Sequence, residues 1–294
     1  MSVGLIGLGA MGLPMSRNMV LRGHTVVGYD VAAERLAAAA DVGVEPAGSL
    51  AELMDACDVV LACLPTDESM VALGHDAVPH IRAGHLLVVT GTHSLAVMST
   101  LDRLFRAAGA SVVDAPVVFG GTNTANGTLV SLLGGTETDV ERARPVVMGY
   151  SKDAEHVGPL GAGQVAKACN NYLHWVHSVS NFEALALAKR YGVDAEKMRQ
   201  VLMKSPGDNG TLRNFDRYRF TWHEKDMDLV LDLAQDGGLM LPMAAQTDQL
   251  VKSITQGEVI RLLGDESCVY LGQTVTARAA GGVGDLDALP RARR

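Results

Sequence analysis

The chain has 294 residues, a formal net charge of −8 and 48% hydrophobic residues. This apolar content can build sizeable cores, so the composition excludes an intrinsically disordered chain. The acidic balance argues against a nucleic-acid binder, which usually shows a basic excess. The N-terminal stretch lacks a basic segment, and no apolar run approaches the ~20 residues that span a bilayer. We therefore expect a soluble cytoplasmic protein with no targeting segment, no membrane partner and no nucleic-acid partner.

Short β-branched runs alternate with helical patterns in the first half of the chain. The runs predicted as strands are 3–6, 25–29, 59–64, 86–90, 111–114 and 129–133. Repeated strand–helix–strand order predicts a parallel sheet with helices on both faces. Four scattered cysteines without metal-ligand spacing predict reduced thiols and no metal site. The sequence therefore predicts an α/β domain over residues 1–162.

The second half, residues 163–294, changes to a helical pattern. The stretch from Gln164 to Tyr191 has no proline and no internal glycine, and its roughly 28 residues exceed the usual mean of about 12. Further helices are predicted over 194–204, 223–236 and 243–256, and the tail from about residue 274 is expected to fray. We therefore predict an all-helical C-terminal domain that a long helix joins to the α/β domain.

A cofactor loop is predicted at residues 3–12, VGLIGLGAMG, which contain a Gly-x-Gly-x-x-Gly motif. The motif alone is weak, but a strand precedes it, a helix follows it, and the next strand ends at Asp30. Its glycines would make a tight turn and admit a pyrophosphate to the helix start. This pattern is typical of a Rossmann dinucleotide-binding domain. The residues expected to contact the cofactor are Gly7, Leu8, Gly9, Ala10, Met11 and Gly12.

Asp30 decides which cofactor is expected. Its carboxylate can accept hydrogen bonds from a ribose 2′-OH and would repel a 2′-phosphate. No basic residue follows immediately, because the next residues are Val31, Ala32 and Ala33. We therefore favour NAD over NADP; the alternative is a glycine-rich turn that binds no ligand.

Residues 161–171, GAGQVAKACNN, place Lys167 and Asn171 one helical turn apart on the same face. Hydride transfer at a carbon that bears oxygen needs a partner for the hydroxyl proton, and a lysine can serve. Asn171 could hold the substrate oxygen or orient the ammonium group. The alternative is that Lys167 extends to water from an amphipathic helix.

The motifs together resemble those of the β-hydroxyacid dehydrogenase family, whose type member is 3-hydroxyisobutyrate dehydrogenase. The matching stretches are GLIGLGAMGLPMSRNM at 4–19, DAPV at 114–117 with GTL at 127–129, GAGQVAKACNN at 161–171 and KDMDLVLDLA at 225–234. The resemblance covers about residues 2–260. It implies an NAD-dependent oxidoreductase that transfers hydride between nicotinamide and a 3-hydroxy acid or its semialdehyde, as a homodimer or homotetramer.

The resemblance also implies roles for individual residues. Lys167 would be the general acid/base and Asn171 would contact substrate. On the C-terminal motif, Lys225 would lie against the nicotinamide, and Asp232 would support it at the substrate. The further cofactor contacts implied are Leu64, Pro65 and Thr92.

The segment after DAPV departs from the family pattern. The family commonly has Ser-Gly-Gly there, whereas this chain has Val118, Phe119 and Gly120. A valine cannot donate the hydrogen bond with which the serine grips a carboxylate, and a phenylalanine adds bulk. One interpretation is a larger or more apolar substrate. The other is that Gly120, Gly121 and Thr122 bind the acid from a shifted loop.

Two histidines stay open at this point. His93 could titrate near neutral pH, or it could be a helix-start residue without a catalytic role. His174 lies two turns beyond Lys167, and Ser178 one turn further. His174 and Ser178 could line the distal substrate pocket, or they could make interhelical hydrogen bonds.

Three other functions remain in view. An imine reductase shares this architecture, but such enzymes usually replace the lysine. A reductase of a sulfonate or phosphonate semialdehyde would read its anion at residues 118–122, where no arginine stands. A non-catalytic dinucleotide-binding scaffold would tend to lose Lys167. The sequence names neither the substrate nor the physiological direction.

Overall fold

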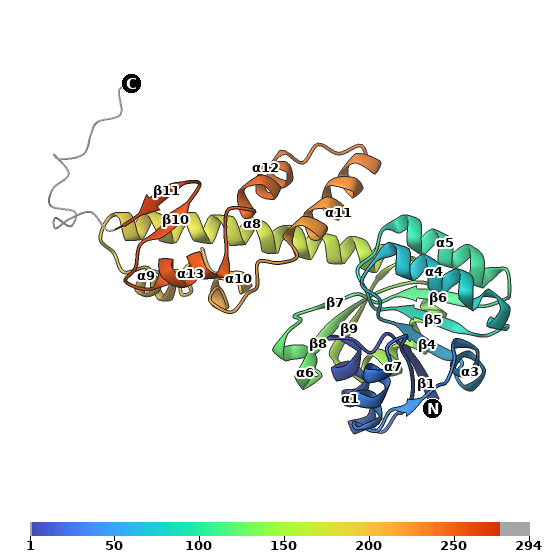
Figure 1. Cartoon of the computed structure of the whole chain (residues 1–294). Helices are drawn as coiled ribbons and strands as arrows, with labels where there is room; N and C mark the ends of the chain where they lie inside the picture. The colour runs from blue at the N-terminus through green and yellow to red at the C-terminus, as the bar shows by residue number, and fades with distance from the viewer. Residues whose placement is uncertain (1, 277–294) are drawn as a thin grey trace. The chain divides into compact units, whose positions relative to one another are not determined.

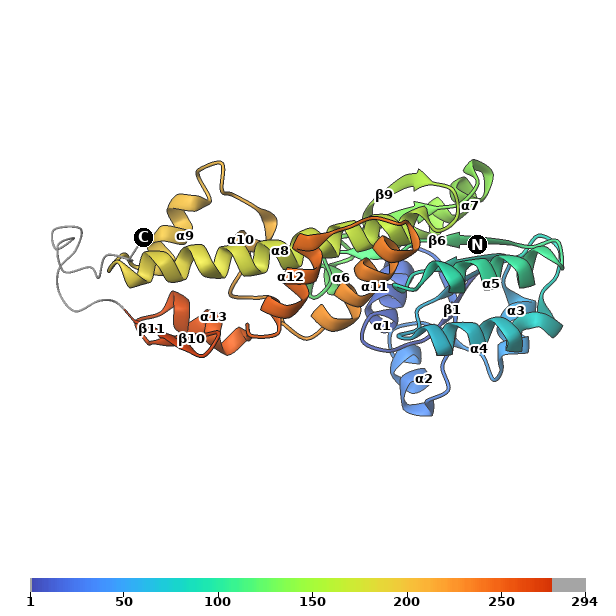
Figure 2. The ribbon, with the colours of Figure 1, turned by 90° about the horizontal axis from the view of Figure 1, so that it is seen from above.

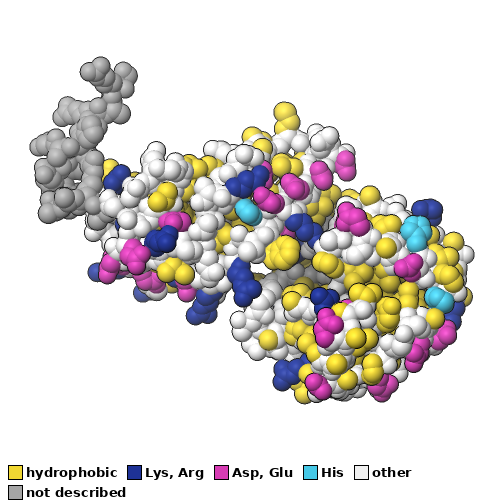
Figure 3. Space-filling view, viewed as in Figure 1, with side chains coloured by type: hydrophobic (Ala, Val, Ile, Leu, Met, Phe, Trp, Pro, Cys, Tyr) yellow, Lys and Arg dark blue, Asp and Glu magenta, His cyan; other side chains and the backbone are white. Residues whose placement is uncertain are grey.

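The structure, a computed structural model, describes residues 2–276. Its contacts divide the chain into two compact units, the first ending at Lys167 and the second beginning at Ala168. None of the helices in the described range combines the length and the hydropathy that crossing a bilayer requires. On the face drawn in Figure 3, acidic and basic side chains are interspersed over both units.

The first unit is built on one sheet whose central strands are parallel (Figure 1). These strands are β1 Ser2–Ile6, β2 Thr25–Tyr29, β3 Glu45–Pro46, β4 Val59–Ala62, β5 Leu86–Val89 and β6 Ser111–Asp114. They are ordered β3-β2-β1-β4-β5-β6. The order reverses between β1 and β4, and ligands of such sheets bind beyond the carboxyl ends of the strands at that point. The predicted Rossmann fold is confirmed.

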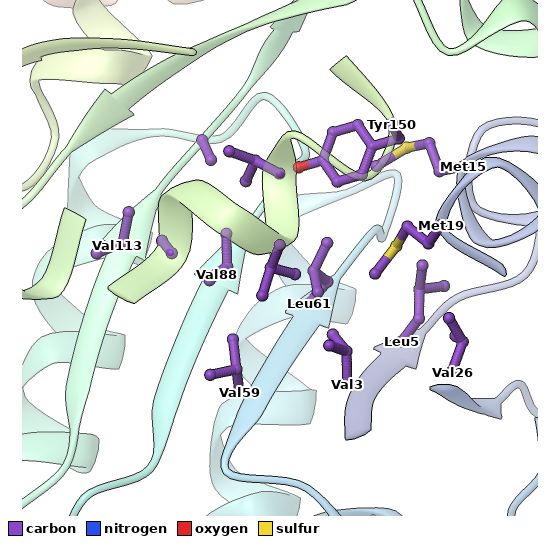
Figure 4. Packing of buried hydrophobic residues seen from close by; sticks show 14 of the residues in the cluster. Val3, Leu5, Met15, Met19, Val26, Val59, Leu61, Val88, Val113 and Tyr150 are labelled. Carbon is purple, nitrogen blue, oxygen red and sulfur yellow. The ribbon is translucent and has the colours of Figure 1, made fainter. Parts of the chain in front are cut away.

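Apolar residues explain why helices cover both faces of this sheet. Every residue of β4 and β5 is buried, and separate clusters of buried side chains lie on the two faces. In Figure 4, Leu5 and Leu61 project from neighbouring strands on the side of Met19, which belongs to α1. One face is covered by α1 Gly12–Leu21, α2 Ala33–Ala40 and α7 Glu137–Val147, the other by α3 Leu50–Ala56, α4 Asp67–Ala77 and α5 Leu95–Arg106.

The sheet continues past β6 with antiparallel pairing that the sequence pattern did not predict. Strand β8, Leu129–Gly134, pairs antiparallel with β6 and with β7, Val117–Val118. Strand β9, Ser151–Gly158, pairs parallel with β8. The chain reverses between β7 and β8 through the short helix α6, Thr122–Asn126. The predicted parallel arrangement therefore holds for β1 to β6 and not for this edge.

The second unit is helical and is organised around α8, which runs from Ala162 to Arg190 over 29 residues. Its other elements are α9 Ala195–Leu202, α10 Gly210–Arg213, α11 His223–Asp236, α12 Pro242–Val251, α13 Gln256–Leu263, β10 Cys268–Tyr270 and β11 Gln273–Val275. They pack around α8 (Figures 1 and 2) through a core that includes Trp175, Phe182 and Phe215. The predicted long helix and helical C-terminal region are confirmed.

Three details of the second unit differ from the prediction. Strands β10 and β11 form a short antiparallel hairpin, so the unit is not entirely helical. The helix predicted over 243–256 ends earlier than expected, at Val251 in α12, and Thr255 caps the start of a separate helix, α13, at Gln256. The tail expected to fray lies outside the described residues beyond 276, and Thr274 and Val275 belong to β11.

A buried lysine near the end of α8 holds the C-terminus of α13. Lys189 is only 7% exposed, and its Nζ donates to the carbonyl oxygens of Arg261, Leu262 and Gly264 at 2.9, 3.2 and 2.7 Å. Carbonyls at a helix C-terminus lack partners within the helix and carry partial negative charge. The ammonium group therefore satisfies them and stabilises the end of α13.

We predict that Lys189→Met lowers the free energy of unfolding by about 2 kcal/mol, because it leaves buried carbonyls without a donor. Chemical denaturation followed by circular dichroism measures this change. The matched control is Lys197→Met at an exposed lysine of α9, which should stay within about 0.5 kcal/mol of the wild type. Equal stability of the two variants would contradict the prediction.

Candidate functional site

The loop between β1 and α1 has the backbone geometry of a dinucleotide cradle. Gly7 has φ of +91°, and a Cβ placed there would lie 2.4 Å from the Cys63 carbonyl oxygen. A Cβ at Gly12 would lie 1.9 Å from the Gly7 carbonyl oxygen. Side chains at these positions would push β1, β4 and α1 apart. A Cβ at Gly9 would meet only Arg35, at 3.8 Å, so the space beside Gly9 is open to a ligand.

The start of α1 completes this cradle. The N-cap residue, Met11, makes no side-chain capping hydrogen bond, and the first turn contains no acidic residue. Amides at the N-terminus of a helix carry partial positive charge and attract phosphate. Leu8 is buried and Ala10 is exposed. The loop and helix start therefore fit a bound pyrophosphate, although the sequence alone could only suggest it.

Asp30 lies beside this loop and is ionised at neutral pH. It is 6% exposed, and its carboxylate accepts from the backbone N–H groups of Leu8 and Ala32 at 2.7 and 3.0 Å. Burial opposes ionisation, but these donors and Arg35 outweigh it and lower the pKa of Asp30. The carboxylate is thus available to accept hydrogen bonds from a ribose.

Arg35 is a cation that the sequence analysis missed. Its Nη1 lies 3.4 Å from Oδ2 of Asp30, and its side chain is 53% exposed. The lack of a basic residue directly after Asp30 argues less strongly against NADP than the sequence suggests, because the first turn of α2 brings Arg35 back to Asp30. An arginine on the first turn after the acidic residue is the signal that could have identified it.

The ends of β4 and β5 place the remaining predicted cofactor contacts. Leu64 is half-buried and Pro65 exposed just after β4, and Thr92 is half-buried after β5. The next residue, His93, is 1% exposed, and its Nδ1 lies 2.9 Å from Oδ1 of Asp67. Burial raises the pKa of the Asp67 carboxyl, but hydrogen bonds with the Ser94 side chain, with His93 and with the Ser94 amide outweigh it and lower the pKa. The buried His93 ring is therefore paired with a partly exposed carboxylate at the start of α5.

The loop after β7 carries the departure from the family pattern. Val118 is buried at 8% exposure, whereas Phe119 is 57% exposed and Gly120 is exposed. Phe119 has φ of +69°, a conformation that costs a non-glycine residue about 1–2 kcal/mol. The ring lies 5.6 Å from Nζ of Lys152. A bulky side chain in a strained conformation indicates a functional constraint.

The same loop lies against the cofactor loop. Asn18 of α1 donates from Nδ2 to the carbonyl oxygens of Thr124 and Ala125 at 2.9 and 3.2 Å. The hydroxyl of Thr124 lies 3.5 Å from the sulfur of Met11. The short helix α6 that follows the Phe119 loop therefore lies beside the cofactor loop within the first unit.

Lys167 is half-buried and lies on α8, one turn beyond a buried anchor. Asp114 is completely buried at the end of β6, and its two carboxylate oxygens accept from the N–H groups of Gly161 and Gln164, each at 2.7 Å. Burial is the main cause that raises the pKa of Asp114 to about 6, and the backbone N–H donors oppose it. Neither Asp114 nor Gln164 was identified from the sequence.

The other predicted residues belong to the second unit. Asn171 is 6% exposed and one turn beyond Lys167. Lys225 and Asp232 are exposed on α11 and two turns apart on one face. His174 pairs through Nδ1 with the Thr211 hydroxyl at 3.0 Å, which favours the interhelical interpretation of this histidine.

Family models identify the two halves of the chain. One, described as the NAD binding domain of 6-phosphogluconate dehydrogenase, matches residues 2–158. The other, described as NAD-binding of NADP-dependent 3-hydroxyisobutyrate dehydrogenase, matches residues 161–261. The chain belongs to the β-hydroxyacid dehydrogenase family. It is an oxidoreductase that binds a pyridine nucleotide, as predicted at this level.

Relatives within the family carry more than one name. A probable 3-hydroxyisobutyrate dehydrogenase of Mycobacterium bovis is 35% identical over 207 residues, 70% of each protein. The NAD-dependent L-serine dehydrogenase of Pseudomonas aeruginosa is 32% identical over 213 residues, 71% of this chain and 72% of that protein. The solved structure of Mycobacterium tuberculosis 3-hydroxyisobutyrate dehydrogenase with L-serine is 29% identical, has a TM-score of 0.80 and covers 89% of this chain and 98% of that one.

The Asp30–Arg35 pair generates a prediction about cofactor choice. Asp30→Ala removes the carboxylate that would repel a 2′-phosphate and releases the guanidinium of Arg35, so the ratio of NADP affinity to NAD affinity should rise about 10-fold or more. Fluorescence titration with both reduced nucleotides measures the ratio. The double variant that adds Arg35→Ala should lose most of this gain. An unchanged ratio in Asp30→Ala would show that this pair does not select the cofactor.

Proposed function

We propose that the protein is an NAD-dependent dehydrogenase of a 3-hydroxy acid, or the reductase of the matching semialdehyde. The observation that carries this proposal is Lys167, which lies half-buried directly after the anchored start of α8. The relatives are named for 3-hydroxyisobutyrate and for L-serine. Both compounds have a carboxylate on the first carbon and a primary alcohol on the third, and they differ at the second. We infer that this chain acts on the same alcohol.

A bound nicotinamide would supply the hydride acceptor or donor. Lys167 would exchange the hydroxyl proton: its neutral amine accepts the proton when the alcohol is oxidised, and its ammonium returns it when the aldehyde is reduced. Asn171, buried one turn along the same helix, would hold the substrate oxygen. Lys225 would contact the cofactor, and Asp232 would act beside it at the substrate.

We infer NAD as the cofactor from the ionised state of Asp30. Its carboxylate lies beside the open space at Gly9 and can accept from ribose hydroxyls. Arg35 is paired with this carboxylate, so the guanidinium supports Asp30 rather than a 2′-phosphate. The Asp30 carboxylate would have to be removed before the same arginine could favour NADP.

The reaction class can be tested by following nicotinamide reduction with a panel of 3-hydroxy acids whose substituents at the second carbon increase in size. We predict activity with NAD, and a loss of about 10²- to 10⁴-fold in kcat for Lys167→Ala, because general acid–base catalysis contributes this much. Nucleotide affinity should be retained. Lys197→Ala, at an exposed lysine of α9, is the matched control and should keep full activity.

Two results would overturn this proposal. Full activity of Lys167→Ala would remove the lysine from the mechanism. If the wild-type protein binds nucleotide but shows no activity with any acid of the panel, another carbonyl or imine substrate, or a scaffold without catalysis, would be favoured.

The same panel tests whether Phe119 contacts the substituent at the second carbon and selects for its size. We predict that Phe119→Gly lowers kcat/KM for the most apolar substrate about 10-fold relative to the smallest one, because it removes an apolar contact. Its free energy of unfolding should not fall, since glycine adopts positive φ without strain. Phe119→Leu keeps an apolar side chain and should retain the preference. An unchanged preference in Phe119→Gly would assign the altered specificity to another residue.

A further inference from the structure

Two fully buried polar side chains hold the first turn of α8 within the first unit. Asp114, at the end of β6, accepts from the N–H groups of Gly161 and Gln164. These amides belong to the start of α8, where the helix has no other acceptors for them. The carboxylate thus fixes the helix start to the end of a central strand.

Gln164 ties the same turn to the loop that follows β5. Its side chain is completely buried. Oε1 accepts from the backbone N–H of His93, and Nε2 donates to the carbonyl oxygen of Gly91, both at 2.9 Å. Both partners lie in the segment between β5 and α5. The side-chain amide of Gln164 therefore pairs with one backbone donor and one backbone acceptor, and these two bonds fix both its position and its orientation.

Close backbone packing leaves the first turn of α8 little room to move against the sheet. A Cβ at Gly163 would lie 2.2 Å from the carbonyl oxygen of Leu132 on β8. A Cβ at Gly134 would lie 2.3 Å from Oδ1 of Asp114. The first turn of α8 is thus in direct contact with β8 and is also tied to β6 and to the loop after β5. It cannot shift without breaking several contacts together.

The choice of residues indicates more than a need to cap a helix. The usual capping side chain at a helix start belongs to the N-cap residue itself, and Asp, Asn, Ser and Thr all serve, whereas Asp114 reaches the start of α8 from a strand about 50 residues earlier. Here the carboxyl is completely buried, and this burial raises the pKa of Asp114 to about 6. An ionised group in such a place is unfavourable for folding unless it is well hydrogen-bonded. Its two acceptors, however, fix two amides where a hydroxyl would fix one.

We propose that Asp114 and Gln164 are positioning residues that hold Lys167 at the distance and orientation that proton transfer requires. Lys167 lies three residues after Gln164, so it follows directly, about one helical turn beyond the turn that these contacts fix. The inference rests on the proposed role of Lys167 as the general acid/base. A displacement of about 1 Å at a reacting group can lower the rate about 100-fold.

A graded series at Gln164 tests this inference. Gln164→Glu keeps the acceptor for the His93 N–H and loses the donor to Gly91, whereas Gln164→Met keeps the length of the side chain and loses both. We expect kcat per folded protein to fall about 10-fold in the first and about 100-fold in the second. Asp114→Asn, which keeps one acceptor of two, should resemble Gln164→Glu. The affinity for reduced nucleotide, measured by fluorescence, should be unchanged.

The control is Lys189→Met, at the other end of the same helix, which should lower stability while kcat per folded protein stays at the wild-type value. A structural role of Asp114 and Gln164 would give the same pattern as this control. Wild-type kcat in folded Gln164→Glu and Asp114→Asn would overturn the inference, even if Gln164→Met does not fold. Full activity of Lys167→Ala in the same assay would instead overturn the proposed function, and with it the role assigned to these two residues.

Discussion

The candidate site depends on the hydrogen bonds between the carboxylate of Asp114 and the start of α8. Burial of this carboxylate is unfavourable in isolation, and the amides of Gly161 and Gln164 at the positive end of α8 compensate for it. Asp114 ends a strand whose last three residues are buried, so little space is open for its carboxylate to leave this contact. The position of the start of α8 is therefore set by the end of β6. Lys167 lies three residues after Gln164 and depends on that position.

Local patterns allowed the central fold to be predicted from the sequence. Strands β1, β2, β4, β5 and β6 are apolar because both faces are covered, and the glycine motif reports a backbone geometry that only glycine tolerates. Strand β9 could not be recognised, because only Ser151 and Ala154 among its residues are buried and it pairs with β8 alone. Strand β3 has two exposed residues and no pattern at all. Their places in the sheet come from pairing partners, which a single segment does not reveal.

The candidate site divides in the same way. Gly7, Gly12 and Asp30 could be identified because the motif spans one βαβ unit and its spacing has a physical meaning. Asp114 and Gln164 are separated by 50 positions, and Gln164 and His93 by 71. A sequence shows which residue types are present but not which of them face one another across such distances. Arg35 lies nearer, yet its contact with Asp30 depends on where α2 begins.

The loop that carries Phe119 and the start of α8 have separate anchors, so under the proposed function substrate choice could change without displacing Lys167. The loop that carries Phe119 is held from α1, through Asn18 to Thr124 and through Arg22 to Gly127. The start of α8 is held instead by Asp114 on β6 and by the bonds of Gln164 to the loop after β5. On the proposed function, a substitution in the loop that carries Phe119 would change what fits beside the cofactor while Lys167 keeps its place. This arrangement explains how a strained phenylalanine can stand beside an intact lysine motif, because function on such folds varies through loops on a rigid framework.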